Sequence, residues 1–195
     1  MTEAKASVED TTHKRMLGIV GSPRRGGNTE ILVDEILAGA AEAGADTEKI
    51  ILNELNILPC QACDACKDGG ECVQEDDMSE LLKQMERCRI WILGTPVYWW
   101  GPSAQLKVFI DRWYGANQAI FKGRTIIVTI PMGSGNKKLA QHIVGMLNDI
   151  CGYLGMNITA TVLAPGVHGR GAVREHPRVL DAARQAGRAA VEGNS

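Results

Sequence analysis

Apolar strands alternate with amphipathic helices along the chain, and this alternation is what most restricts the fold. Five short apolar runs predict strands, and segments with apolar residues at helical spacing lie between them and after the last one. The strands are expected at residues 16–20, 50–52, 89–94, 125–130 and 158–163. Strands joined through helices pair in parallel, because the chain must cross the sheet before the next strand begins. The pattern therefore predicts a three-layer α/β sandwich with a five-stranded parallel sheet.

Length and composition fit one globular domain with a full core. The chain has 195 residues, of which 45% are hydrophobic and 23% charged, and its formal net charge is −2 at pH 7. This small charge gives no reason to expect nucleic acid or a membrane surface as a partner. The first residues do not form a signal peptide, and no apolar run approaches membrane-spanning length. We therefore expect a flexible tail over residues 1–13, a single domain over 14–195 and a cytoplasmic location.

A glycine-rich turn, Gly21–Thr29, lies between the first predicted strand and the first helix. Such a junction presents unpaired backbone N–H groups and the positive end of the helix dipole, which suit a bound phosphate. Ser22, Asn28 and Thr29 can donate side-chain hydrogen bonds to it, and Arg24 or Arg25 supplies positive charge. The turn lacks both the dinucleotide spacing G-x-G-x-x-G and the lysine of the G-x4-G-K-[ST] motif. A mononucleotide such as FMN therefore fits best, while the alternative is an ordinary glycine-rich turn.

Two further loops are expected at the same edge of the sheet, because the carboxyl ends of parallel strands meet there. The loop after the third strand is aromatic and bracketed by prolines, and the loop after the fourth strand is rich in glycine. Together they suit the flat, mostly apolar slot of a flavin ring. The expected contacts are Pro96, Val97, Tyr98 and Trp99 in the first loop and Met132, Gly133, Ser134 and Gly135 in the second. The aromatic residues would equally suit core packing or a subunit contact.

A polar segment over residues 53–76 has no helical or strand periodicity and contains four cysteines. They are Cys60, Cys63, Cys66 and Cys72, in the spacing C-x2-C-x2-C-x5-C. Thiolates at this spacing suit the corners of a metal–sulfur cluster. Zinc, a thiol–disulfide switch and inert cysteines are the alternatives. Cys88 and Cys151 stand apart in apolar segments and are expected to be buried packing residues.

Together, these motifs resemble the flavodoxin-like NAD(P)H-dependent FMN reductases and, within them, the iron–sulfur flavoprotein family. The similarity runs from about residue 15 to residue 165. It is carried by the glycine-rich turn, the cysteine run, Asp76–Met78, Thr95–Trp99 and Leu106–Arg112. The resemblance implies a flavodoxin-like fold and a 4Fe–4S cluster on the four cysteines. It further implies FMN with its phosphate held by Ser22, Arg24, Asn28 and Thr29 and its ring surrounded by residues 96–99 and 132–135. It also implies a homodimer or homotetramer.

The sequence thus predicts an FMN-dependent oxidoreductase that passes electrons between NAD(P)H or ferredoxin, FMN and a 4Fe–4S cluster. The acceptor would be a small molecule or a protein. No residue stands out as a catalytic acid or base, and His168, in the glycine-rich segment 165–171, is the one histidine to watch. The alternatives are a cluster-free NAD(P)H-dependent FMN or quinone reductase and a non-enzymatic electron carrier. Because the cysteine segment leaves an edge strand in the flavodoxin-like order, the flavin partner of the cluster is expected in a neighbouring subunit.

Overall fold

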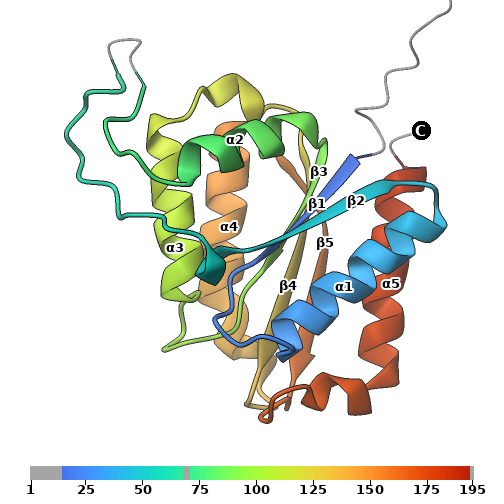
Figure 1. The fold of residues 1–195 in the computed structure, drawn as a ribbon. Helices are drawn as coiled ribbons and strands as arrows, with labels where there is room; N and C mark the ends of the chain where they lie inside the picture. Colours follow the sequence, from blue (N-terminus) through green and yellow to red (C-terminus); the bar gives the residue numbers. More distant parts are fainter. Residues whose placement is uncertain (1–14, 68–70, 194–195) are drawn as a thin grey trace, which may run out of the picture.

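The computed structural model describes residues 15–67 and 71–193, so the expected tail over residues 1–13 lies outside the described residues. Five parallel strands form one sheet in the order β2-β1-β3-β4-β5 (Figure 1). The strands are β1 (Arg15–Val20), β2 (Asp46–Ile51), β3 (Ile90–Gly94), β4 (Thr125–Met132) and β5 (Asn157–Pro165). This is the flavodoxin-like order, and it confirms the predicted fold class.

Helices cover both faces of the sheet and complete the three layers. Helices α1 (Asn28–Glu42) and α5 (Pro177–Glu192) lie on one face, and α2 (Met78–Arg87), α3 (Ala104–Asp111) and α4 (Gln141–Leu154) lie on the other (Figure 1). Short 3-10 turns are η2 (Leu52–Glu54), η3 (Arg112–Gly115), η4 (Gln118–Ile120), η5 (Lys137–Ala140) and η6 (Ala172–Glu175). Among the described residues, no helix is both long and apolar enough to cross a membrane.

Strand β2 begins four residues before the predicted start at residue 50. Its first residues, Asp46 to Lys49, are polar and lie at the edge of the sheet, where one side of the strand has no neighbour. Apolar periodicity therefore cannot identify this part of the strand, and the parallel pairing with β1 defines it instead.

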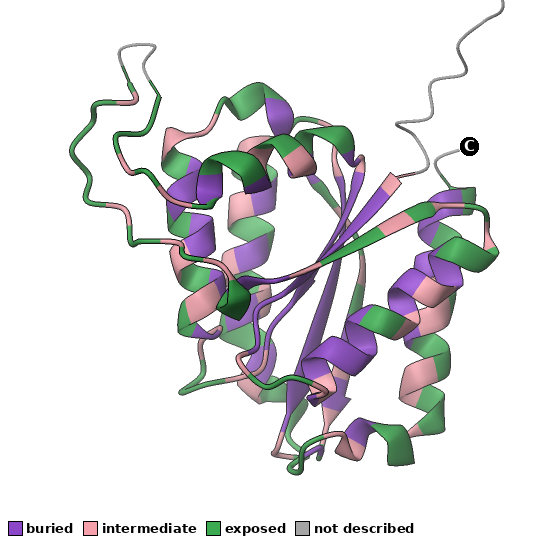
Figure 2. Cartoon of the chain, viewed as in Figure 1, coloured by how far each residue is buried: buried purple, intermediate pink, exposed green. Residues whose placement is uncertain are grey.

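The sheet separates two hydrophobic cores, because successive side chains of a strand point to opposite faces. In β3, Ile90 and Ile92 pack with α1 and α5, whereas Trp91 and Leu93 pack with α2, α3 and α4. The strands are buried along most of their length, while the cysteine segment is largely exposed (Figure 2). Cys88 and Cys151 are buried, as expected, and burial raises the pKa of the Cys151 thiol to about 11.

An aromatic cluster anchors the turn η3 in the core that lies between the sheet and helices α2, α3 and α4. Trp113 packs edge-on against Phe109, with ring centroids 5.3 Å apart, and its centroid lies 5.1 Å from that of Phe121. Trp91 meets Phe121 in a similar edge-on contact at 5.9 Å. Burying four large rings in one cluster stabilises the core strongly and gives η3 a defined position.

Helices α1 and α5 approach each other so closely that their backbones touch. A Cβ added at Gly187 would lie 1.9 Å from the carbonyl oxygen of Ile36, and one at Gly39 would lie 1.9 Å from that of Arg184. No side chain fits in that space, so the close packing of these helices depends on glycine at both positions.

We expect Gly187→Ala to lower the free energy of unfolding by about 1 to 3 kcal/mol, because the helices must separate to admit the methyl group. Gly145→Ala is the matched control, since Gly145 lies in α4 and a Cβ added there would have open space around it. That change should raise the free energy of unfolding by about 0.5 to 1 kcal/mol, as expected for alanine in a helix. Urea denaturation measures both, and equal effects would contradict this account of the α1–α5 contact.

Candidate functional site

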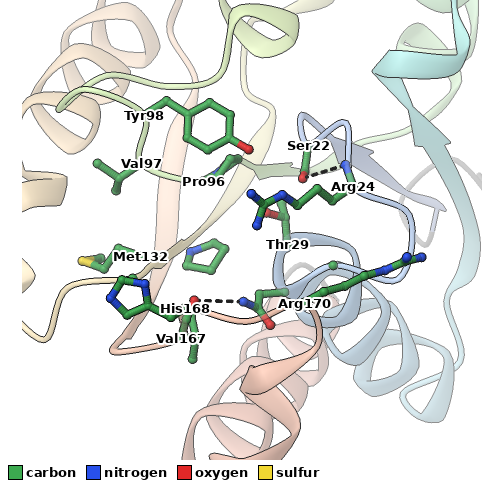
Figure 3. Close-up of a pocket in the computed structure, with 14 residues that line it drawn as sticks. Ser22, Arg24, Thr29, Pro96, Val97, Tyr98, Met132, Val167, His168 and Arg170 are labelled. Atoms are coloured by element: carbon green, nitrogen blue, oxygen red, sulfur yellow. Dashed lines mark hydrogen bonds between the residues drawn. The ribbon is translucent and has the colours of Figure 1, made fainter.

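A pocket opens at the carboxyl edge of the sheet, between the loops that follow β1, β3, β4 and β5 (Figure 3). Nine of the twelve residues expected to contact a flavin line it: Ser22, Arg24, Asn28, Thr29, Pro96, Val97, Tyr98, Met132 and Gly133. The other three, Trp99, Ser134 and Gly135, do not line it. The loop after β5 adds Val167, His168 and Arg170.

The glycine-rich turn leaves the first N–H groups of α1 without a capping side chain. Gly27 is the N-cap and carries no side chain, and Gly26 has a left-handed φ of 62° that lets the chain turn back. The side chains of Ser22 and Thr29 border the same pocket and are almost fully buried. This end of the pocket therefore offers backbone N–H groups, two hydroxyl groups and the positive end of a helix dipole to an anion.

A buried carboxylate, that of Glu30, stabilises the glycine-rich turn. Glu30 accepts a hydrogen bond from the Gly26 N–H at 2.6 Å and pairs with Lys49 at 3.0 Å and with Arg25 at 3.2 Å. Burial by itself would raise the pKa of Glu30, but the Gly26 hydrogen bond and the Lys49 charge outweigh it and hold the pKa below its usual range. Arg25 also pairs with Glu54 and does not line the pocket. Arg24 is therefore the cation that this turn supplies to the pocket.

The side chain of Asn28 joins the turn to the loop after β5. Its amide nitrogen donates to the carbonyl oxygens of Val167 at 3.0 Å and Gly169 at 2.8 Å, and its oxygen accepts from the Val173 N–H at 3.0 Å. The sequence predicts a phosphate contact for this side chain, but its three hydrogen bonds are made to the loop. Asn28 therefore positions a wall of the pocket, and only its backbone N–H is left for an anion.

The loop 166–173 was not among the predicted site segments, although His168 had been singled out. The Val167 N–H donates to the carbonyl oxygen of Met132 at 3.0 Å, which joins the loop to the end of β4. The ring of His168 lies against the backbone of Gly133, where an added Cβ would be 3.0 Å from it. Arg170 lines the pocket beside the glycine-rich turn. The position of this loop could have indicated its role, since it also follows the carboxyl end of a strand.

The aromatic loop divides its residues between the pocket and the surface. Tyr98 and Gly101 exchange two backbone hydrogen bonds of 2.9 Å, and Trp99 and Trp100 between them have left-handed φ angles of 48° and 61°. This conformation is rare for residues other than glycine. The turn leaves Tyr98 at the pocket and Trp99 91% exposed. The geometry of this turn therefore places Trp99 outside the pocket. The residue type of Trp99 alone does not predict that geometry.

The four cysteines border a second, smaller cavity together with Arg112, Tyr114 and Gly115. Ala62 and Asp64 have left-handed φ angles of 51° and 60°, so the backbone reverses between successive cysteines. Within residues 15–67 and 71–193, no three His, Cys, Asp or Glu side chains are arranged as a metal-ligand group. The structure therefore brings four thiols to one cavity without gathering them around one point.

The pocket and the cysteine cavity are separate in the folded chain. They share no lining residue, and the cysteine segment extends away from the end of the sheet where the pocket lies (Figure 1). A change in one cavity therefore need not disturb the other.

Comparisons with known proteins find similar flavin-dependent proteins. A family model described as NADPH-dependent FMN reductase matches residues 14–168. An iron–sulfur flavoprotein from Methanocaldococcus jannaschii is 48% identical over 98 residues, which are 50% of this chain and 51% of that protein. The putative NAD(P)H-dependent FMN-containing oxidoreductase YwqN from Bacillus subtilis is 30% identical, with 85% of this chain and 93% of that protein covered.

A solved structure shares the fold over most of its length. The Trp repressor binding protein from Bacillus subtilis superposes with a TM-score of 0.68 at 26% identity, covering 89% of this chain and 98% of that one. By contrast, the matches with the first curated relatives span between 51% and 65% of their length.

We expect Asn28→Ala to free the loop 166–173, because it removes three hydrogen bonds that each contribute about 1 kcal/mol. Hydrogen exchange would detect this as faster exchange at the Val173 amide, with little change at the strands. Asn117→Ala is the matched control, since Asn117 caps the short turn η4 and accepts from the Ala119 N–H at 3.0 Å. An unchanged exchange rate at Val173 in the Asn28 variant would contradict the positioning role.

Proposed function

The chain belongs to the NADPH-dependent FMN reductase family, and on that basis we propose that it is an FMN-dependent oxidoreductase with NAD(P)H or ferredoxin as its electron donor. The observation that carries the proposal is the pocket at the carboxyl edge of the sheet, which has an anion-binding end and an apolar end. Bound FMN would accept two electrons as a hydride and release electrons one at a time.

The anion-binding end suits the phosphate of FMN. We propose that it is held by the side chains of Ser22, Arg24 and Thr29 and by the first N–H groups of α1, including that of Asn28. Among the described residues, no carboxylate pairs with Arg24, which leaves its charge free for a phosphate. Arg170 also lines the pocket, next to Gly26 of the turn.

The apolar end suits the flavin ring. Pro96, Val97 and Tyr98 would cover one side of the ring, and Met132 and Gly133 the other. Of the predicted ring contacts, we keep those that line the pocket, so Trp99, Ser134 and Gly135 are not included. The close approach of His168 to Gly133 depends on glycine at that position, since a Cβ there would meet the histidine ring.

For the cysteine cavity, we propose a 4Fe–4S cluster held by Cys60, Cys63, Cys66 and Cys72, which would pass single electrons to a small-molecule or protein acceptor. Four thiols on one cavity form the donor set that such a cluster requires. Ligand binding and local ordering are coupled at metal sites, so thiols that border one cavity can be drawn together when the metal binds.

Two features extend this proposal to an oligomer. The two cavities lie apart in one chain, and the cysteine segment follows the edge strand β2. We therefore propose that the cluster of one subunit serves the flavin of another in a homodimer or homotetramer.

A cluster-free NAD(P)H-dependent FMN or quinone reductase is the second candidate. It is favoured by the lack of a metal-ligand group among the described residues and by the similarity to YwqN over most of both chains. A non-enzymatic electron carrier would have the same cofactors but no turnover with a nicotinamide.

Anaerobic purification followed by chemical analysis distinguishes these candidates. We expect FMN together with about four iron and four sulfide ions per chain, and an absorption shoulder at about 400 nm that dithionite bleaches. Flavin without iron or sulfide would support the cluster-free reductase. FMN-dependent oxidation of NADH or NADPH would then separate an enzyme from a carrier.

We expect Cys63→Ser to lose iron and sulfide while it retains FMN, because the two cavities share no residue. Cys151→Ala is the matched control, since this thiol is buried in α4 away from both cavities, and it should retain both cofactors. Iron, sulfide and flavin analyses of the two variants measure the outcome. Loss of FMN from the Cys63 variant would show that the cysteine segment supports the pocket.

A further inference from the structure

The turn η3 forms one side of the cysteine cavity. Trp113 anchors the turn in the aromatic cluster, and its neighbours Arg112, Tyr114 and Gly115 face the cavity. The Tyr114 hydroxyl donates to Asp64 at 2.7 Å, and a Cβ at Gly115 would lie 3.2 Å from the sulfur of Cys66. This short turn therefore joins the cysteine cavity to the buried core.

Arg112 is the buried charge of this turn. Its guanidinium pairs through both terminal nitrogens with Asp76, and the two side chains are only 3% and 0% exposed. Its Nη1 also donates to the carbonyl oxygen of Leu58 at 2.9 Å. Asp76 in turn accepts from the N–H groups of Leu58 at 2.9 Å and Met78 at 3.1 Å. The pair thus ties together the two ends of the cysteine segment.

One donor of Arg112 points at a cysteine. Its Nη2 lies 3.4 Å from the sulfur of Cys72, within hydrogen-bonding distance for sulfur. A buried ion pair costs desolvation energy, and an apolar pair would often serve stability equally well. A buried cation against a thiol is, however, what a thiolate-ligated metal site requires, because donors to the sulfur orient the ligand and offset its negative charge.

We propose that Arg112 is a positioning residue of the four-cysteine site, which holds Cys72 in place and makes a cluster bound there easier to reduce. The inference rests on the proposed cluster. One electron from the reduced flavin would add one negative charge to the site, with no bond made or broken. The nearby guanidinium stabilises that added charge, so its removal disfavours the reduced form.

The first test uses Cd²⁺ as a probe on the reduced, metal-free full-length chain. Cd²⁺ binds thiolates, and titration followed by ultraviolet absorption gives its affinity without any iron. We expect Arg112→Gln to weaken Cd²⁺ binding about 10- to 100-fold, as loss of a residue that supports a metal ligand commonly does. The Cd²⁺ affinity of Arg112→Lys should lie between those of the wild type and Arg112→Gln, because lysine keeps the charge but cannot form the bidentate pair with Asp76.

Two further variants keep the test decisive. If Arg112→Gln does not fold, the double variant Arg112→Gln/Asp76→Asn removes both buried charges and should show the same weakening. The matched control is Arg124→Lys, since Arg124 is also partly buried and donates to the carbonyl oxygens of Ile120, Cys88 and Glu86, away from the cavity. This control should bind Cd²⁺ as the wild type does.

The second test is a dithionite titration of the reconstituted iron–sulfur protein. We expect the midpoint potential of the cluster to be lower in Arg112→Gln than in the wild type and in Arg124→Lys, and the potential of Arg112→Lys, which keeps the charge, to lie between those of Arg112→Gln and the wild type. Unchanged Cd²⁺ affinity and midpoint potential in folded Arg112 variants would overturn the inference and leave the proposed cluster intact. A wild-type chain that binds Cd²⁺ but assembles no cluster would instead overturn the proposed function, and the Cd²⁺ affinities alone would then decide the role of Arg112.

Discussion

The parallel register of the sheet is the constraint on which the pocket depends. Val20, Gly94 and Thr129 are neighbours across three adjacent strands, and Thr129 pairs onward with Val162 of β5. The strands therefore end near one another, and the loops that follow four of them meet at a single edge. Segments from distant parts of the chain supply a phosphate end and an apolar end to one cavity only because the register holds these strand ends together.

The two cavities have different kinds of support. The pocket is largely formed in advance, because the Asn28 side chain and the backbone at the end of β4 hold the loop 166–173 through hydrogen bonds to its backbone. Most of the described residues of the cysteine segment are instead exposed, and η3 borders the cavity that they line. A preformed pocket binds its ligand at a small cost in conformational entropy, whereas an exposed segment must gain order from the ligand itself.

Much of the fold and part of the site could be predicted from the sequence, for physical reasons. Buried strands such as β3 and β4 are continuous apolar runs, so they were located well, whereas the polar start of the edge strand β2 was missed. Ser22 and Thr29 line the pocket, and they could be singled out because a glycine-rich turn before a helix has a local signature. The link between Asn28 and Val167 spans 139 residues and has no such signature. The outward turn at Trp99 depends on backbone angles that its residue type disfavours.

The pairing of Arg112 with Asp76 explains why a motif can be visible in a sequence while its role is hidden. Both residues belong to segments that carried the family resemblance, yet 36 residues separate them. Only the folded chain shows that a single guanidinium contacts the carboxylate, the Leu58 carbonyl group and a cysteine sulfur. Stability alone gives little reason to bury such a charge, because desolvation offsets most of the attraction. The contact with sulfur supplies a reason, since a fixed positive charge beside a thiolate offsets its negative charge.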